Sequence, residues 1–276
     1  MKSGTSQEVR VRSRIVRRPA AASGPRPPGI PARALPPLTK KLRMTAMTAV
    51  SPERQPPPRE NCYRCFRPKV NCFCDAIRPF EPRTLVAILM HPKEERKQRT
   101  GTGRLTHLCL TGSKMLTGED FTSDVHVNRL IDDPALYPVV LFPDETARTI
   151  DREGLRVPEG RRLLVFVPDG TWRQARKILR LSTNLQALPR LRFTPPEISR
   201  FLIKKEPRPQ YVSTIESVHY LLGELERLGL EPKGPARERL MAILDRLVRF
   251  QLDHAGGRRR VRLRRKPAHP TQKEIP

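Results

Sequence analysis

The sequence predicts an α/β fold built on a mostly parallel sheet. Short apolar runs recur along the middle of the chain, and such runs are typical of strands that are buried on both faces of a parallel sheet. Segments with apolar residues at helical spacing lie between these runs. The alternation of strands with helices is the pattern of α/β proteins, in which helical crossovers join parallel strands.

Five segments of the chain are expected to be strands. They are residues 84–90, 124–130, 137–142, 162–167 and 198–203. The first is the run TLVAILM, which is bounded by Pro82 and Pro92. The second is chosen because its polar and apolar residues alternate, whereas the third and fourth are continuous apolar runs.

Four segments are expected to be helices because their apolar residues recur every three or four positions. They are residues 103–116, 172–182, 213–229 and 236–254. The third has the clearest boundaries. Ser213 and Glu216 form a capping-box pattern at its start, and Gly229 supplies a stop.

Three side chains directly follow buried strands and are expected at one rim of the sheet. They are His91, Pro143 and Asp169. Ligands of open α/β sheets bind beyond the carboxyl ends of the strands. The sequence therefore predicts a ligand site at this rim.

Charge and composition indicate a nucleic-acid partner and flexible ends. The 276 residues carry 54 Lys and Arg against 28 Asp and Glu, a formal net charge of +26. A surplus that large is typical of proteins that bind polyanions, above all nucleic acid, although a soluble protein with basic tails remains an alternative. Residues 1–58 are rich in Arg and Pro and are expected to be a disordered basic arm, and residues 255–276 form a basic tail.

Apolar runs are too short for a membrane span, and the basic start lacks the apolar core of a secretory signal. We therefore expect a cytoplasmic protein with no membrane partner, in which cysteines stay reduced. The oligomeric state has no signature in the sequence.

Four cysteines lie close together as C-x2-C-x6-C-x-C: Cys62, Cys65, Cys72 and Cys74. Four thiolates at this spacing can close a tetrahedral zinc site, and no ligand position would remain open for catalysis. We therefore expect a structural zinc module over residues 59–80, followed by one domain over residues 81–254. Four thiols without a metal are the alternative. Cys109 lies on an apolar helix face and is expected in the core.

Two segments at the predicted rim have both a functional and a structural interpretation. His91 ends a strand, and Thr102 opens a helix whose free N–H groups favour an anionic ligand. A flexible connection and a packing histidine would explain the same residues. Asp169 could act chemically at the rim, or it could cap the helix that begins at Trp172.

The chain resembles the DTW-domain family. Asp169–Trp172 reads D-x-T-W and is followed by RQARK. The cysteine cluster, HPKEERKQRTGTGRL, LFPDE, VPDGTWRQARK and YVSTIES occur in the order of the family's motifs. The resemblance covers about residues 60–250.

The resemblance implies a tRNA-uridine aminocarboxypropyltransferase. Such an enzyme moves the 3-amino-3-carboxypropyl group of S-adenosylmethionine to N3 of a uridine in tRNA and releases methylthioadenosine. The implied fold is SPOUT-like, with helices on both faces of the sheet and a C-terminal knot. Asp169 is the candidate base or substrate anchor, Thr171 a hydrogen-bonding group, and Trp172 a stacking or bracing ring.

The resemblance also assigns binding residues. The cofactor-binding set is Leu141, Phe142, Pro143, Ser213, Thr214 and Glu216. The set expected to contact substrate or RNA is His91, Arg99, Thr102, Arg104, Arg173 and Lys204. For Ser213 and Glu216, a well-formed helix cap is an equal alternative.

Two positions depart from the family pattern. Gly101 stands where the family usually has Asn, and Lys204 stands near a common Arg, so a bidentate grip on a carboxylate is in doubt. The nearest alternatives in function are the same transfer on ribosomal RNA and methyl transfer by a SPOUT-type site. A non-catalytic RNA-binding protein with a zinc knuckle is the alternative of another class.

Overall fold

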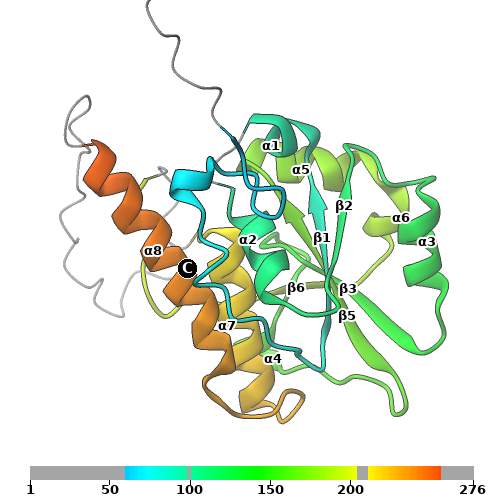
Figure 1. Cartoon of the computed structure of the whole chain (residues 1–276). Helices are drawn as coiled ribbons and strands as arrows, with labels where there is room; N and C mark the ends of the chain where they lie inside the picture. The colour runs from blue at the N-terminus through cyan, green and yellow to red at the C-terminus, as the bar shows by residue number, and fades with distance from the viewer. Residues whose placement is uncertain (1–59, 98–100, 204–210, 256–276) are drawn as a thin grey trace, which may run out of the picture. The chain divides into compact units, whose positions relative to one another are not determined.

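A computed structural model describes residues 60–97, 101–203 and 211–255 (Figure 1). These residues belong to one compact unit, within residues 56–276. The predicted arm at 1–58 and nearly all of the predicted tail at 255–276 lie outside the described residues. No helix among the residues described is long and apolar enough to cross a membrane.

A six-stranded sheet forms the centre of this unit, and every pairing between neighbouring strands is parallel. The strand order is β2-β1-β5-β3-β6-β4. The strands are β1 Leu85–Met90, β2 Lys114–Thr117, β3 Leu136–Leu141, β4 Arg148–Thr149, β5 Arg162–Asp169 and β6 Arg190–Arg192. The predicted parallel α/β architecture is confirmed.

Helices cover both faces of the sheet. The α-helices are α1 Pro92–Lys97, α2 Thr102–Cys109, α3 Val125–Asp132, α4 Ile150–Glu153, α5 Trp172–Leu181, α6 Thr183–Gln186, α7 Thr214–Arg227 and α8 Glu238–Ala255. Two short 3-10 helices, η1 Lys69–Asn71 and η2 Pro235–Arg237, complete the set in the described part of the chain. Side chains of α2, α4, α7 and α8 enter one core, and those of α3, α5 and α6 enter the other (Figure 1).

The cysteine-bearing segment at residues 60–80 precedes the strands of the sheet along the chain (Figure 1). Its buried side chains Phe73 and Ile77 belong to the same core as α2, α7 and α8. The Phe73 ring meets the Phe250 ring of α8 edge to face, with 5.7 Å between the centroids. This segment is therefore packed onto the α/β sheet and its helices.

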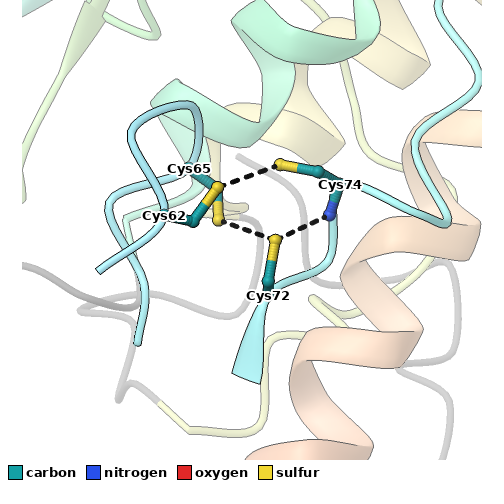
Figure 2. A group of neighbouring side chains, drawn as sticks. All are labelled: Cys62, Cys65, Cys72 and Cys74. Atoms are coloured by element: carbon teal, nitrogen blue, oxygen red, sulfur yellow. Dashed lines mark hydrogen bonds between the residues drawn. The ribbon is translucent and has the colours of Figure 1, made fainter. Parts of the chain in front are cut away.

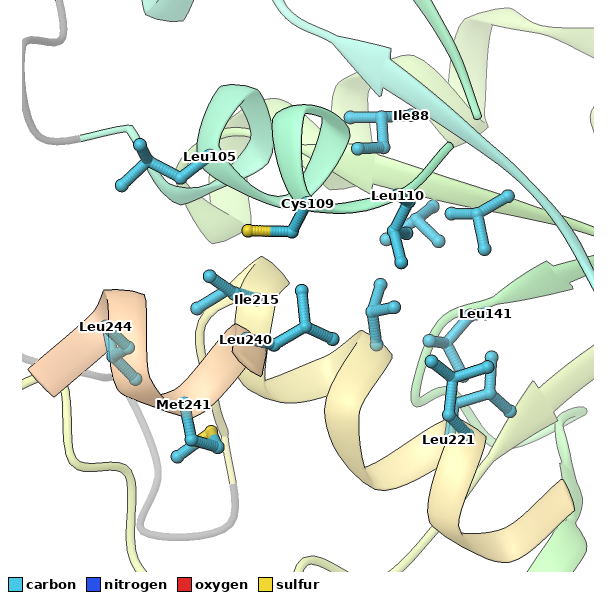
Figure 3. Packing of buried hydrophobic residues seen from close by; sticks show 14 of the residues in the cluster. Ile88, Leu105, Cys109, Leu110, Leu141, Ile215, Leu221, Leu240, Met241 and Leu244 are labelled. Carbon is cyan, nitrogen blue, oxygen red and sulfur yellow. The ribbon is translucent and has the colours of Figure 1, made fainter. Parts of the chain in front are cut away.

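Strand periodicity explains how one sheet serves two cores. In β5, Val165 and Val167 face the first core, whereas Leu164 and Phe166 face the second, because successive side chains of a strand point to opposite faces. Figure 3 shows the first core, where side chains of α2, α7 and α8 meet Ile88 of β1. Cys109 is fully buried in it, as predicted, and burial raises the pKa of its thiol to about 12.

The predicted start of α7 is confirmed in detail. The backbone N–H of Ser213 donates to Glu216 Oε2 at 2.8 Å, and the two residues form a reciprocal capping box. Gly229 follows the helix with a φ of +75°, a conformation that favours glycine at a helix stop.

Three predicted elements were wrong. The helix expected over 103–116 ends at Cys109, and Lys114–Thr117 forms β2. The strand expected over 124–130 is the helix α3, because Asp124 caps it by accepting hydrogen bonds from the N–H groups of His126 and Val127, both at 2.9 Å. Residues 198–203 contain no strand.

The turn at residues 198–203 has a specific cause. Glu216 accepts hydrogen bonds from Ser199 Oγ at 2.8 Å and from the Arg200 N–H at 2.6 Å, which ties this stretch to α7. The strand that pairs with β3 is instead Arg190–Arg192. The implied C-terminal knot stays a prediction, because residues 204–210 of the connection from β6 to α7 lie outside the described residues.

Candidate active site

A cavity of about 310 Å³ lies beyond the carboxyl ends of β3 and β5. Segments that are distant in sequence line it, and they include residues 101–102, 141–143, 167–173, 192–193 and 212–214. This is the rim at which ligands of parallel α/β sheets bind. Pro143 and Asp169 of the predicted rim contribute to the lining, whereas His91 does not.

Asp169 is the last residue of β5 and is only 4% exposed. Thr214 Oγ1 donates a hydrogen bond of 2.6 Å to Asp169 Oδ1. On another side the carboxylate lies against Gly103, where a Cβ would come within 2.5 and 2.6 Å of its two oxygens. Asp169 therefore contacts the first turns of both α2 and α7, whose positive dipole ends stabilise a nearby negative charge.

The corner after Asp169 is built from a glycine and a helix cap. Gly170 has a φ of +156°, which residues with side chains rarely adopt. Thr171 caps α5, because its Oγ1 accepts from the Gln174 N–H at 3.3 Å and its own N–H donates to Gln174 Oε1 at 2.6 Å. The interpretation of Asp169 as the cap of this helix was therefore wrong, and the carboxylate faces the cavity lining instead.

Trp172 forms part of an aromatic wall of the cavity. Its ring stacks on Tyr211 with 3.8 Å between centroids and an interplanar angle of 25°, and it lies 5.8 Å from the Phe142 ring. Stacked aromatic rings of this kind fix one another's orientation. Trp172 thus braces the corner and also lines the cavity.

The residues predicted to bind the cofactor divide into two groups. Those that line the cavity are Leu141, Phe142, Pro143, Ser213 and Thr214. Glu216 is fully buried and does not line it. Its carboxylate is occupied by Ser199, Arg200 and Ser213, so Glu216 has the geometry of a structural link rather than a ligand contact.

The residues predicted to contact RNA are also divided. Thr102 and Arg173 line the cavity. Arg104 lies with its guanidinium 4.2 Å from the Phe66 ring centroid. Arg99 and Lys204 lie outside the described residues.

The structure places His91 in the interior, as the packing interpretation expects. It is only 2% exposed, with Nε2 at 2.8 Å from Glu119 and Nδ1 accepting from the Lys93 N–H at 3.1 Å. Burial lowers its pKa, and the neutral ring then donates from Nε2 to Glu119. Its backbone N–H donates to the Asp169 carbonyl at 3.0 Å, so the backbone of His91 helps to fix the position of the corner after β5.

The four cysteines converge as their spacing predicts (Figure 2). All four Sγ atoms lie within 4.8 Å of one another, and the pairs Cys62–Cys74 and Cys65–Cys72 are both 3.7 Å apart. A tetrahedral zinc with bonds of about 2.3 Å has sulfur–sulfur edges of about 3.8 Å. The donor set and its geometry therefore fit zinc.

Backbone N–H groups favour the thiolate form of Cys62, whereas burial raises the pKa of the Cys74 thiol. Hydrogen bonds from the N–H groups of Cys65 and Arg64 are the main cause that lowers the pKa of the Cys62 thiol to about 6. Thiolates are the metal-binding form of cysteine. The turn is closed by a 2.8 Å hydrogen bond from the Phe66 N–H to the Cys62 carbonyl.

A family model described as the DTW domain matches residues 59–252, most of the chain. The chain belongs to the DTW-domain family. Proteins named tRNA-uridine aminocarboxypropyltransferase 2 are 30% identical in Drosophila melanogaster and 27% identical in Mus musculus. The matches cover 72% and 71% of this chain, and 78% and 65% of the fly and mouse proteins.

An Arabidopsis thaliana protein named tRNA-uridine aminocarboxypropyltransferase A is 26% identical over 70% of this chain and 81% of its own length. No solved structure matches the chain.

Some residues of the DTW-domain cavity were not anticipated. Glu94 is a second carboxylate in the lining and is only 5% exposed. It lies in the first turn of α1, directly after β1, so its place beyond a strand end was the available signal. Phe193 and Phe201 also line the cavity, but Phe193 lies outside every predicted element and Phe201 was expected in a strand that does not form.

Proposed function

We propose that this DTW-domain protein is a tRNA-uridine aminocarboxypropyltransferase. It transfers the 3-amino-3-carboxypropyl group of S-adenosylmethionine to N3 of a tRNA uridine and releases methylthioadenosine. The observation that carries the proposal is the cavity at the carboxyl rim, where Asp169 lies between two helix starts. The names of the relatives support the reaction.

The cavity lining suits this co-substrate. Its volume of about 310 Å³ lies within the range of about 300–1,000 Å³ that is usual for small-molecule sites. Leu141, Phe142 and Pro143 offer an apolar side for adenosine. Thr214 and Asp169 offer polar groups for the charged amino-acid arm.

The bound sulfonium compound supplies an electrophilic methylene carbon, to which uridine N3 bonds as the carbon–sulfur bond breaks and N3 loses its proton. The protein must therefore align one carbon with N3 and receive a proton. Alignment is the task of the aromatic and apolar lining, since a well-oriented pair reacts far faster than a free one. Asp169 accepts the N3 proton or holds the amino group of the arm, and Thr214 fixes one of its oxygens for either role.

Binding of tRNA is assigned to a basic ridge that starts at the cavity. Arg173 lines the cavity, and Arg176 and Arg180 continue along the same face of α5 at helical spacing. All three are exposed, and none forms an ion pair with another described residue. An unpaired arginine ridge suits a phosphate backbone, together with the net charge of +26.

Zinc is assigned a structural role. The four thiolates would complete its coordination, so it would supply no open position for substrate. A reducing compartment keeps these thiols free to bind the metal, and we place the protein in the cytoplasm for that reason.

The first experiment identifies the small product formed from S-adenosylmethionine and tRNA. Methylthioadenosine supports the proposal, whereas S-adenosylhomocysteine would indicate methyl transfer. Transfer to ribosomal RNA but not to tRNA would show that ribosomal RNA is the substrate of the same reaction. Binding of tRNA without either product would leave only an RNA-binding protein.

The variant Asp169→Asn tests the role of the carboxylate at nearly constant shape. As a base, Asp169 is needed for transfer but not for co-substrate affinity, so the variant should bind S-adenosylmethionine normally and lose at least about 100-fold in rate. As an anchor, its loss should weaken co-substrate binding as well. Unchanged transfer and binding would contradict both roles.

A further inference from the structure

The turn that carries the first two cysteines exposes aromatic side chains. Tyr63 is 91% exposed and Phe66 is 56% exposed. Three of the six exposed large hydrophobic residues in the described part of the chain lie within residues 63–70. Large apolar groups that gather on a surface mark a site of interaction.

The backbone at Phe66 adds an independent observation. Its φ is +57°, and it is the one residue other than glycine with a positive φ among the described residues. Phenylalanine is strained there, whereas glycine would not be. Burial does not explain the choice, since more than half of the side chain is exposed. A strained residue whose side chain is not buried in the core points to a function of that side chain.

The charge around this turn identifies the chemistry of the partner. Of the three cations in residues 61–74, Arg67 is buried and Lys69 pairs with Glu60, which leaves Arg64 as the exposed cation of the turn. Arg64 is exposed and has no ion pair with any residue described. Arg104 of α2 lies over the Phe66 ring at 4.2 Å. Exposed rings interleaved with arginine are the surface on which single-stranded nucleic acids stack their bases.

The turn also lies near the candidate active site. Arg104, which contacts Phe66, belongs to the first turn of α2, and Thr102 of the same turn lines the cavity. Nucleotides that flank a base in the cavity would therefore be within reach of the aromatic turn.

We propose that Tyr63 and Phe66 form a stacking platform for unpaired bases of the RNA substrate. The cysteine cluster fixes the turn, and Arg64 and Arg104 supply positive charge beside the rings. The platform rests on the proposed function in that tRNA is its ligand. It adds a second contact region, separate from the cavity and from the arginine ridge of α5.

The test compares tRNA binding by full-length Phe66→Gly and Tyr63→Ser with that of the wild type. Phe66→Gly removes the ring and relieves the backbone strain, so its melting temperature should stay close to that of the wild type and its zinc content should not change. Each variant should bind tRNA about 5- to 160-fold more weakly, the range for one lost stacked base. The slope of log Kd against log salt should not change, because stacking releases no counterions.

Val125→Ser is the matched control. Val125 is 58% exposed on α3 and belongs neither to the cysteine turn nor to the arginine ridge of α5, so tRNA affinity should stay within twofold of the wild type. Folded variants with wild-type tRNA affinity would overturn the platform while leaving the proposed function intact. A reduced salt slope would assign the turn to phosphate binding and would also overturn it. A wild-type protein that neither binds nor modifies tRNA would overturn both proposals.

Discussion

Gly103→Ala should damage the candidate active site far more than the fold. Gly103 is the second residue of α2, and its backbone suits alanine because its φ is not positive. An added Cβ would lie 2.5 and 2.6 Å from the oxygens of Asp169, whereas ordinary contacts begin at 3.4 Å. The carboxylate must therefore move by about 1 Å, and a misplacement of that size can cost about 100-fold in rate. Such a shift is also enough to break the 2.6 Å hydrogen bond from Thr214.

The stability of this variant should change much less. Alanine gains up to about 1 kcal/mol over glycine in a helix, whereas overpacking a buried site costs about 1–3 kcal/mol. The net loss of about 0–2 kcal/mol should lower the melting temperature by at most about 8 °C in a domain of this size.

The assay measures transfer to tRNA with S-adenosylmethionine labelled in its carboxyl carbon, next to thermal melting. Gly223→Ala is the matched control, because Gly223 is also helical and its nearest neighbour is the flexible end of Arg237 at 3.3 Å. The control should keep its activity. Normal transfer by a folded Gly103→Ala protein would refute the argument that the position of the Asp169 carboxylate decides the rate.

Three further predictions follow from other parts of the molecule. Removal of zinc by a chelator, or Cys65→Ser, should destabilise the whole domain by up to about 3–6 kcal/mol, because the burial of Phe73 and Ile77 contributes about that much. Thermal melting combined with metal analysis measures this loss. Burial lowers the pKa of His219 below its usual 6.5. The contribution of the neutral ring to stability should therefore be complete above pH 6.5 and should be lost as the pH falls below it. In urea titrations at several pH values, His219→Gln should reduce this dependence of the unfolding free energy on pH. Arg176→Gln should weaken tRNA binding and reduce the slope of log Kd against log salt by about 0.7–0.9, the share of one phosphate contact.

The sequence predicts the centre of the fold well because burial on both faces leaves a simple signature. The runs that became β1, β3 and β5 are continuous and apolar, and these three strands form the middle of the sheet. Their carboxyl ends carry the cavity, so the position of the site was also accessible. The convergence of four thiols followed from spacing alone.

The errors lie where a single contact outweighs the periodic pattern. Residues 124–130 alternate like a strand, yet the side chain of Asp124 starts a helix there. Ile198 to Ile203 look like a strand, yet Glu216 holds that backbone from α7, 16 or 17 positions later. Long-range hydrogen bonds of this kind leave no trace in local sequence. The same reasoning applies to Glu216. Its capping box with Ser213 could be predicted from the sequence, but its hydrogen bonds from Ser199 and Arg200 could not.

The cysteine cluster and the carboxylate are joined by one helix. At its first turn, α2 presents Gly103 to Asp169 and Arg104 to Phe66 of the cysteine turn. Further along, its buried face packs into the core that also receives Phe73. A change at the cysteines can therefore alter the position of α2 and, through Gly103, the position of the Asp169 carboxylate. The cysteine turn therefore helps to fix the helix that sets the geometry of Asp169.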